Sequence, residues 1–165
     1  MFNLALRYER GEGVELSFEK AVEYYQKASE LGHLDAMFNL AVSYVHGEGV
    51  EQSFEKAVEY YQKASELGHL DAMFNLALRY ERGEGVEQSF EKAVEYYQKA
   101  SELGHENAMF NLAVSYVHGE GVEQSFEKAV EYYQKASELG HKNAMFNLAL
   151  RYTRGEGVEQ SFEKA

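Results

Sequence analysis

Apolar and small side chains recur along this chain three or four residues apart, which is helical spacing, instead of alternating as in a strand. Ala36, Leu40, Ala41 and Tyr44 fall on one face of such a helix, and Gly47 follows as a candidate C′ residue. This pattern predicts an amphipathic helix that ends at the glycine. Its N-cap is expected at the polar residue just before the stripe in each copy, namely Asp35, Asp71, Asn107 and Asn143.

A second amphipathic helix is predicted between Ser53, a candidate N-cap, and Gly68. It spans about 14 residues, or roughly 21 Å at about 1.5 Å per residue. Neither predicted helix can bury its apolar stripe alone, so each needs a partner surface. The stripe of the second helix consists of Phe54, Ala57, Val58, Tyr61 and Ala64.

The two helices recur every 36 residues, so the chain is an array of closely similar units. The predicted repeats are residues 1–36, 37–72, 73–108 and 109–144, followed by a partial repeat 145–165. All 14 glycines fall at three fixed offsets and punctuate the helices. Stacking of successive hairpins buries both stripes, and the sequence therefore predicts a single all-α domain, a right-handed superhelical α-solenoid.

The units differ mainly in a short cassette that alternates between odd and even repeats. Odd units read Leu-Arg-Tyr-Glu-Arg, as in residues 78–82, with Thr153 replacing Glu in the last unit. Even units read Val-Ser-Tyr-Val-His, as in residues 42–46. Such similarity is expected of a designed, consensus-like array, which we favour, or of a recent duplication of a two-repeat unit.

The unit resembles the Sel-like repeat (SLR), a 36-residue relative of the tetratricopeptide repeat, and the resemblance covers the whole chain. Ala41 departs from the family pattern, which usually has Gly there, and Ser53 stands where Asp is frequent. The resemblance implies a non-enzymatic adaptor that holds proteins or peptides. A secreted subgroup with one disulfide per repeat is not matched, because the chain has no Cys. The matching residues in the second unit are Ala36, Leu40, Tyr44, Gly47, Gly49, Val50, Lys56, Ala57, Tyr61, Lys63, Ala64, Glu66 and Gly68.

Composition restricts the possible partners. Of 165 residues, 28 are Asp or Glu and 16 are Lys or Arg, which gives a formal net charge of −12. Phosphate backbones and anionic lipids would repel such a chain, so neither nucleic acid nor a membrane surface is an expected partner. No apolar run approaches the ~18 residues of a membrane span, and no signal-peptide pattern opens the sequence. We expect a soluble protein whose compartment the sequence leaves open.

One asparagine recurs in every first helix, and the resemblance places these helices on the concave face of the solenoid. An Asn amide both donates and accepts hydrogen bonds, so a row of amides suits the backbone of an extended peptide. Rungs about 10 Å apart would match roughly three residues of extended chain. The alternative is a solvent-facing Asn copied with the repeat. The row consists of Asn3, Asn39, Asn75, Asn111 and Asn147.

All six arginines lie in odd units, and three of them are expected on the groove side, where they would bind carboxylates of an acidic segment. Even units carry Val and His at comparable places, so the alternation predicts a ligand with acidic and apolar blocks. Local pairing with nearby glutamates is the alternative. The expected groove residues are Arg10, Arg82 and Arg154 in odd units, and Val45, His46, Val117 and His118 in even units.

The remaining motifs favour no catalytic chemistry. The histidines of the inter-repeat turns are interpreted as turn residues, because a zinc site needs three or four ligands within a few ångströms. The Gly-Glu-Gly-Val segments follow a helix and enclose a glutamate, unlike a phosphate-binding loop. Nothing combines a nucleophile, a base and a pocket, so neither an enzyme nor a cofactor is expected. The turn histidines are His33, His69, His105 and His141.

The predicted function is a non-enzymatic scaffold that binds a peptide or protein segment on its concave face. The alternative is an artificial or self-assembling array with no evolved ligand. In that case the terminal repeats expose surfaces that neighbours would cover, and we expect head-to-tail association or fraying of the last unit. A fragment of a longer array would have similar ends.

Overall fold

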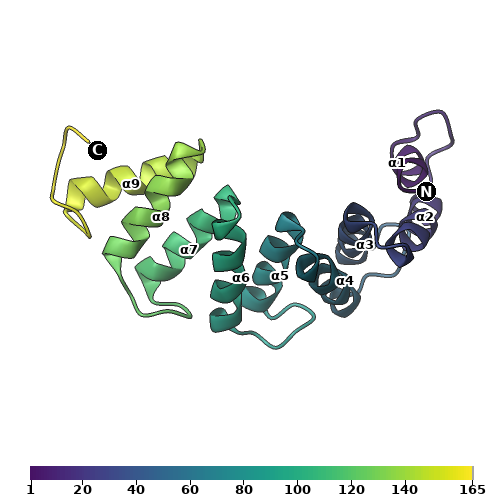
Figure 1. Ribbon diagram of the computed structural model, residues 1–165, viewed down its shortest axis with the longest axis horizontal. Helices are drawn as coiled ribbons and strands as arrows, with labels where there is room; N and C mark the ends of the chain where they lie inside the picture. The colour runs from purple at the N-terminus through teal and green to yellow at the C-terminus, as the bar shows by residue number, and fades with distance from the viewer. Residues whose placement is uncertain (165) are drawn as a thin grey trace. The chain divides into compact units, whose positions relative to one another are not determined.

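Helices joined by two kinds of turn make up the structure, a computed structural model that describes residues 1–164 (Figure 1). All nine regular elements in that range are α-helices, which confirms the all-α prediction. The first helices of the repeats are α1 (Phe2–Arg10), α3 (Leu34–His46), α5 (Leu70–Arg82), α7 (Glu106–His118) and α9 (Lys142–Arg154). The second helices are α2 (Phe18–Glu30), α4 (Phe54–Glu66), α6 (Phe90–Glu102) and α8 (Phe126–Glu138).

Serine begins the second helices and glycine ends the first helices, as predicted. The Ser53 hydroxyl accepts a hydrogen bond from the backbone N–H of Lys56 at 3.2 Å, and the same cap begins α2, α6 and α8. Gly47 has a left-handed φ of 71°, and its N–H donates to the carbonyl of Ser43 at 2.8 Å. Glycine adopts this conformation without the Cβ clash that other residues suffer.

The predicted N-caps of the first helices were wrong, because histidine performs this role. The helix begins two residues earlier than expected, and the imidazole Nδ1 of His33 accepts the backbone N–H of Ala36 at 3.4 Å. Asp35 lies inside the first turn, where its negative charge complements the helix dipole. The other predicted caps, Asp71, Asn107 and Asn143, likewise follow a capping histidine, namely His69, His105 and His141.

The second glycine of each Gly-Glu-Gly-Val loop allows close contact between repeats. A Cβ placed on Gly49 would lie 2.3 Å from the carbonyl carbon and oxygen of Phe18, the first residue of α2 in the preceding repeat. Any side chain at Gly49 would therefore push the loop away from that helix. A Cβ placed on Gly85 would lie at the same distance from the carbonyl group of Phe54, so the close approach recurs. The loop serves to pack one repeat against the next.

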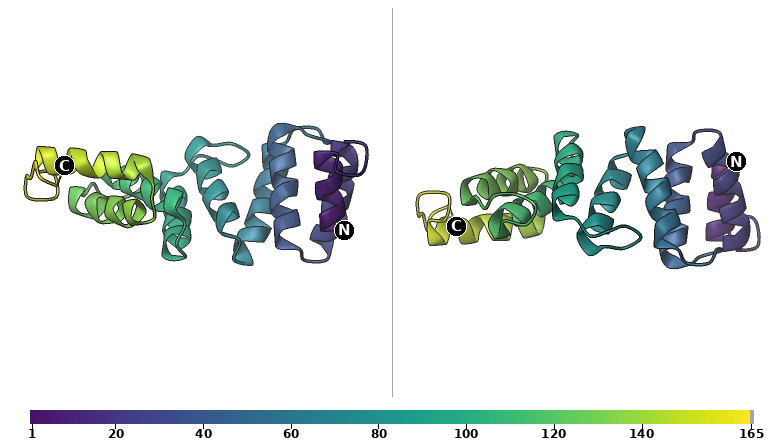
Figure 2. Two further views of the ribbon diagram at one scale, coloured as in Figure 1. Left: turned by 90° about the horizontal axis from the view of Figure 1, so that it is seen from above. Right: turned by 90° about the horizontal axis from the view of Figure 1, so that it is seen from below.

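The helices form two compact units, Met1–Gln88 with α1 to α5, and a second unit that begins at Ser89 and contains α6 to α9. Within each unit every helix packs against the next one along the chain (Figure 2). This is the stacking that the amphipathic pattern predicts for helical hairpins. That the repeats form a single domain stays a prediction.

Tyr61 of the predicted stripe enters the core, whereas its neighbour Tyr60 remains near the surface. Tyr61 is 2% exposed. Tyr60 stacks on Tyr44 with ring centroids 5.9 Å apart, and the Nζ of Lys63 lies 5.1 Å from its centroid. The core between the helices otherwise consists mainly of alanine, valine, leucine and methionine, including the fully buried Leu40.

Candidate functional site

First helices of consecutive repeats touch near their N-terminal ends, which arranges equivalent residues in rows. Phe2 in α1 stacks on His33 before α3 with ring centroids 4.3 Å apart, and Phe38 in α3 stacks on His69 before α5 at 4.8 Å. In the second unit the same stack joins α7 to the start of α9. We call the surface of α1, α3 and α5 in the first unit, and of α7 and α9 in the second, the first-helix face.

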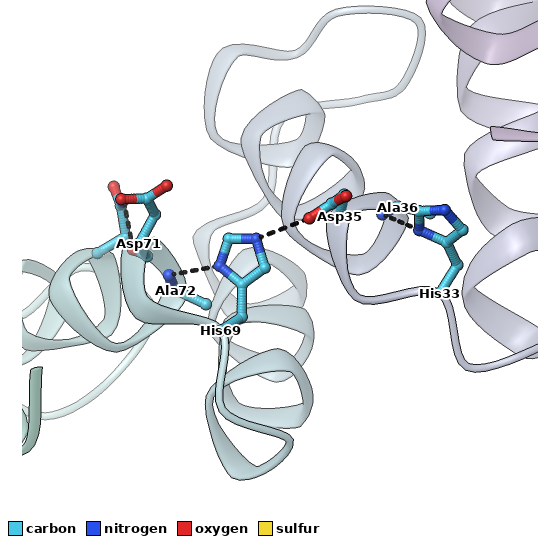
Figure 3. A network of polar contacts seen from close by, with 7 residues as sticks. His33, Asp35, Ala36, His69, Asp71 and Ala72 are labelled. Atoms are coloured by element: carbon cyan, nitrogen blue, oxygen red, sulfur yellow. Dashed lines mark hydrogen bonds and ion pairs between the residues drawn. The ribbon is translucent and has the colours of Figure 1, made fainter. Parts of the chain in front are cut away.

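His69 caps its own helix with one ring nitrogen and reaches the preceding repeat with the other (Figure 3). The Nδ1 of His69 accepts the N–H of Ala72 at 3.2 Å, and its Nε2 lies 3.4 Å from the Oδ1 of Asp35 in the preceding repeat. These contacts explain why the histidine recurs. Within residues 1–164 no three or more His, Asp or Glu side chains converge on a position for a metal ion.

In the even repeats the asparagine of the predicted row is bonded to a buried tyrosine. The Nδ2 of Asn111 donates to the hydroxyl of Tyr97 at 3.0 Å. Asn39 makes the equivalent hydrogen bond to Tyr25, whose hydroxyl in turn donates to the Oε2 of Glu9 at 3.0 Å. One amide N–H of each of these two asparagines is therefore engaged within the protein.

In the odd repeats the asparagine turns to its own helix. The Nδ2 of Asn75 donates to the backbone carbonyl of Asp71 at 2.8 Å, and Asn147 bonds to the carbonyl of Asn143 at the same distance. Asn3 is exposed in α1. The five amides thus lie at equivalent positions but hold different partners, so they do not form a uniform ladder.

Burial and charge perturb the tyrosines beneath the first-helix face. Burial, reinforced by the negative charge of Glu9, raises the pKa of Tyr25 well above its usual value, while Asn39 opposes the shift. Burial also raises the pKa of Tyr61, to about 12, although the positive charge of Arg79 lowers it. The buried tyrosine of the first repeat thus faces a negative charge, that of Glu9, and the buried tyrosine of the second repeat faces a positive charge, that of Arg79.

The odd-repeat arginines serve two distinct purposes, which sequence reasoning missed. Arg79 is only 6% exposed, and its guanidinium lies 5.5 Å from the ring centroid of Phe54 in the preceding repeat. It also forms an ion pair with Glu84 in the loop that follows α5. Arg151 repeats this arrangement with Phe126 and Glu156. The signal was available as a glutamate five residues after each arginine, although even repeats keep that glutamate without the arginine.

The predicted groove arginines are the other set and remain at the surface. Arg82 and Arg154 are exposed in the last turns of α5 and α9, and Arg10 has a similar place in α1. Arg10 lies 4.0 Å from Glu12, and both side chains are mostly exposed, so this ion pair is weak. The third and fifth repeats thus have one buried and one exposed arginine each, whereas both arginines of the first repeat are exposed.

The even repeats place valine and histidine in the same last turn. His46 and His118 are exposed, while Val45 and Val117 are half-buried. The Nε2 of Gln52 donates to the carbonyl of Val45 at 2.6 Å, and so satisfies one of the carbonyls at the end of α3. The predicted groove residues therefore occur together at the C-terminal ends of the first helices.

Comparison with known proteins agrees with the repeat pattern. Residues 1–33, 34–69, 70–105, 107–141 and 142–165 each match the Sel1 repeat. After the first, the matched segments begin just after the capping histidines, about three residues before the methionines at which the predicted repeats begin. A search of the curated proteins found no match.

Solved structures share the fold closely. A protective antigen of uropathogenic Escherichia coli that displays an SLR fold has 32% identity and a TM-score of 0.97, over 99% of this chain and 35% of that one. A Sel1 repeat protein from Oxalobacter formigenes has 31% identity and a TM-score of 0.92, over 99% and 65%. Helicobacter pylori cysteine rich protein B has 30% identity and a TM-score of 0.65, over 84% and 99%. This chain spans less than two thirds of the first two proteins.

Fold and repeat pattern together define an all-α repeat solenoid, as predicted. The chain belongs to the Sel1 repeat family. Proteins of this family are typically protein-interaction scaffolds and are generally non-catalytic. Of the helices in residues 1–164, none has both the length and the apolar character needed to cross a membrane.

Proposed function

We propose that this chain is a non-enzymatic scaffold that binds an extended peptide or protein segment on its first-helix face, the concave face expected from the sequence. The observation that supports it is the row of half-buried or exposed amides and last-turn side chains, which recurs on adjacent helices. The ligand contacts are Asn3, Asn39, Asn75, Asn111, Asn147, Arg10, Arg82, Arg154, Val45, His46, Val117 and His118.

Peptide recognition here combines backbone bonding with side-chain contacts. The free carbonyl and N–H of Asn39 and Asn111 pair with a peptide backbone without reading its sequence. Val45 and Val117 offer apolar contacts in the even repeats, and the exposed arginines offer charge in the odd repeats. Because the first helices are held together by ring stacking, the site is preorganised within each unit.

A peptide-library selection against the intact chain tests this proposal. The test variant carries Asn39→Ala, Asn75→Ala and Asn111→Ala. The matched control removes three exposed amides from second helices, with Gln62→Ala, Gln98→Ala and Gln134→Ala. We expect one enriched motif that the control retains and the test variant loses. Equal enrichment for all three proteins, or none for the intact chain, would contradict the proposal.

Thermal melting must accompany the selection because Asn39 and Asn111 also support buried tyrosines. Loss of a hydrogen bond of this kind costs about 1 kcal/mol. A small decrease in melting temperature is therefore expected in the test variant, and binding is compared well below it. A second variant, Asn75→Ala alone, leaves the tyrosine contacts intact and isolates the effect on binding.

A second candidate function is self-association without a separate ligand, as in an artificial or self-assembling array. It is favoured by Met145 and Phe146 in α9, which are 47% and 65% exposed, whereas Met37 and Met73 at the equivalent position are 8% exposed. Either further repeats or another copy of the chain would cover these side chains. Sedimentation at increasing concentration, with Met145→Gln/Phe146→Gln as the test variant, distinguishes oligomers that use this surface from a monomer.

A further inference from the structure

The C-terminal ends of the first helices carry a positively charged or protonatable side chain in every repeat of this acidic protein. In the first unit these are Arg10, His46 and Arg82, and in the second unit they are His118 and Arg154. All five are exposed. We call each set the basic row of its unit.

Helix capping does not account for the basic row. At the end of α5 the carbonyl of Arg79 accepts the N–H groups of Gly83 and Glu84, and the carbonyl of Glu81 accepts the Nε2 of Gln88 at 2.8 Å. The corresponding carbonyls of α3 are satisfied in the same way. The exposed guanidinium of Arg82 is thus not required to complete its helix and is free to bind a ligand.

Apart from Glu12, which lies 4.0 Å from Arg10, acidic side chains in residues 1–164 do not occupy the basic row. Within residues 1–164 no ion pair involves His46, Arg82, His118 or Arg154, whereas the buried Arg79 and Arg151 have glutamate partners. Glu9, next to Arg10, accepts the hydroxyl of Tyr25. In the following loops, Glu84 and Glu156 pair with buried arginines, whereas Glu12 forms only a weak, exposed ion pair with Arg10.

Charges on the helices packed against α3 are engaged elsewhere. On α2 and α4, Glu23 and Glu59 pair with Lys27 and Lys63, and Glu19 and Glu55 accept serine hydroxyls. Lys20 and Lys56 lie over tyrosine rings. Glu30 and Glu66 are exposed at the far ends of α2 and α4, and Glu48 and Glu51 are exposed in the loop that follows His46. These carboxylates remain in solvent.

We propose that the basic row binds the carboxylates of an acidic, extended peptide, and that protonation of its histidines strengthens the binding. This inference rests on the proposed peptide-binding function and names its ligand class. The peptide we consider carries a carboxylate at every third residue, which spaces these charges about 10 Å apart along an extended chain. Arginine supplies a constant charge, and histidine supplies one when it is protonated.

The test measures binding of the full chain to a labelled synthetic peptide with glutamate at every third position, separated by alanine and serine. The row variant is Arg10→Gln/Arg82→Gln. The matched control, Lys27→Gln/Lys63→Gln, removes two positive charges from the second helices. We expect the row variant to weaken binding about five- to tenfold at low salt, and the control to change it less than about twofold. Equal weakening by both variants would overturn the proposal, because it would indicate non-specific attraction.

A pH comparison tests the histidines separately. Lowering the pH from about 8 to about 6 leaves the peptide glutamates ionised and is expected to tighten binding about two- to fivefold for the intact chain. The variant His46→Gln/His118→Gln should lose this increase and retain the binding seen at high pH. An unchanged increase in that variant would overturn the role of the histidines. Circular dichroism at both pH values confirms that the capping histidines still support the helices.

The same experiments separate failure of this inference from failure of the proposed function. If library selection yields a neutral motif that depends on the asparagines while the acidic peptide does not bind, the scaffold function stands and the basic row is wrong. If a single-stranded oligonucleotide of equal charge binds in place of the peptide, the ligand class is wrong. If neither selection nor the acidic peptide gives binding, both proposals fail.

Discussion

The buried arginine between repeats offers a quantitative test of how the stack is held together. In Arg79→Ala, the guanidinium over Phe54 and the ion pair with Glu84 are lost, together with the aliphatic stem of the arginine. Arg79 is 6% exposed, so nearly all of this contact area is protected from water. We expect the substitution to loosen the packing between α4 and α5.

The size of this effect follows from opposing contributions. The substitution removes the Cγ and Cδ methylene groups, which contribute about 1.6 kcal/mol at about 0.8 kcal/mol each, and a desolvated cation–π contact that contributes about 1 kcal/mol. The ion pair adds less than about 1 kcal/mol because the side chain of Glu84 is 31% exposed. Against these, the buried Nε of Arg79 has no hydrogen-bond partner, which costs about 1–2 kcal/mol. The net loss in free energy of unfolding is therefore about 1–2 kcal/mol.

Urea denaturation followed by circular dichroism measures this loss, with Arg82→Ala on the same helix as the control. Arg82 is exposed and unpaired, so its variant should lose less than about 0.5 kcal/mol. Arg79→Met retains an apolar side chain in place of the arginine stem. Glu84 can then turn into solvent, as its counterpart Glu48 does in the even repeat, so the free energy of unfolding should fall by about 1 kcal/mol or less. Equal unfolding midpoints for Arg79→Ala and Arg82→Ala would refute the reasoning.

Three further predictions concern the loops, the caps and the tyrosines. Gly49→Ala should destabilise the protein by about 3 kcal/mol or more in urea denaturation, because the new Cβ would meet the backbone of Phe18. In the control Gly68→Ala the new Cβ would have no atom within 4 Å, so only the cost of the positive φ, about 1 kcal/mol, should be lost. His69→Ala should lower the free energy of unfolding by about 1 kcal/mol, because the helix loses its N-cap. His69→Asn should restore most of this stability by providing another cap acceptor. Equal melting temperatures for the two variants would contradict the capping role of His69. The pKa of Tyr61 is raised to about 12 in the folded state from about 10 when unfolded, so its stabilising contribution is present below about pH 10 and is lost as the pH rises to about 12. Tyrosinate absorbance during alkaline titration should therefore rise together with unfolding, and full ionisation of a still-folded chain near pH 10 would contradict the assignment.

Much of the fold followed from the sequence because periodicity and caps are local properties. The stripe that includes Val58 and Tyr61 predicted which face is buried, and Ser53 predicted where α4 begins. The capping histidine was missed because the residue-type preference at N-caps favours Asp35. Only the backbone conformation places the His33 imidazole within reach of the N–H of Ala36.

The candidate site was less predictable because identical residues meet different neighbours. Asn39 and Asn75 occupy the same position in the repeat, yet one bonds to Tyr25 and the other to its own helix. The difference accompanies the alternating cassette, which puts Arg79 into the layer that follows an even repeat. Such contacts depend on packing between repeats, and no pattern within one repeat encodes them.

The most direct test of the central claim is to map where a peptide from the library selection contacts the protein. In an NMR titration, the side-chain amide signals of Asn39 and Asn111 and the backbone signals of Val45 and His46 should shift with the peptide concentration. Signals of the second helices, such as those of Lys63, should remain nearly unchanged. Shifts confined to the second helices, or to the connecting loops, would contradict a ligand site on the first-helix face.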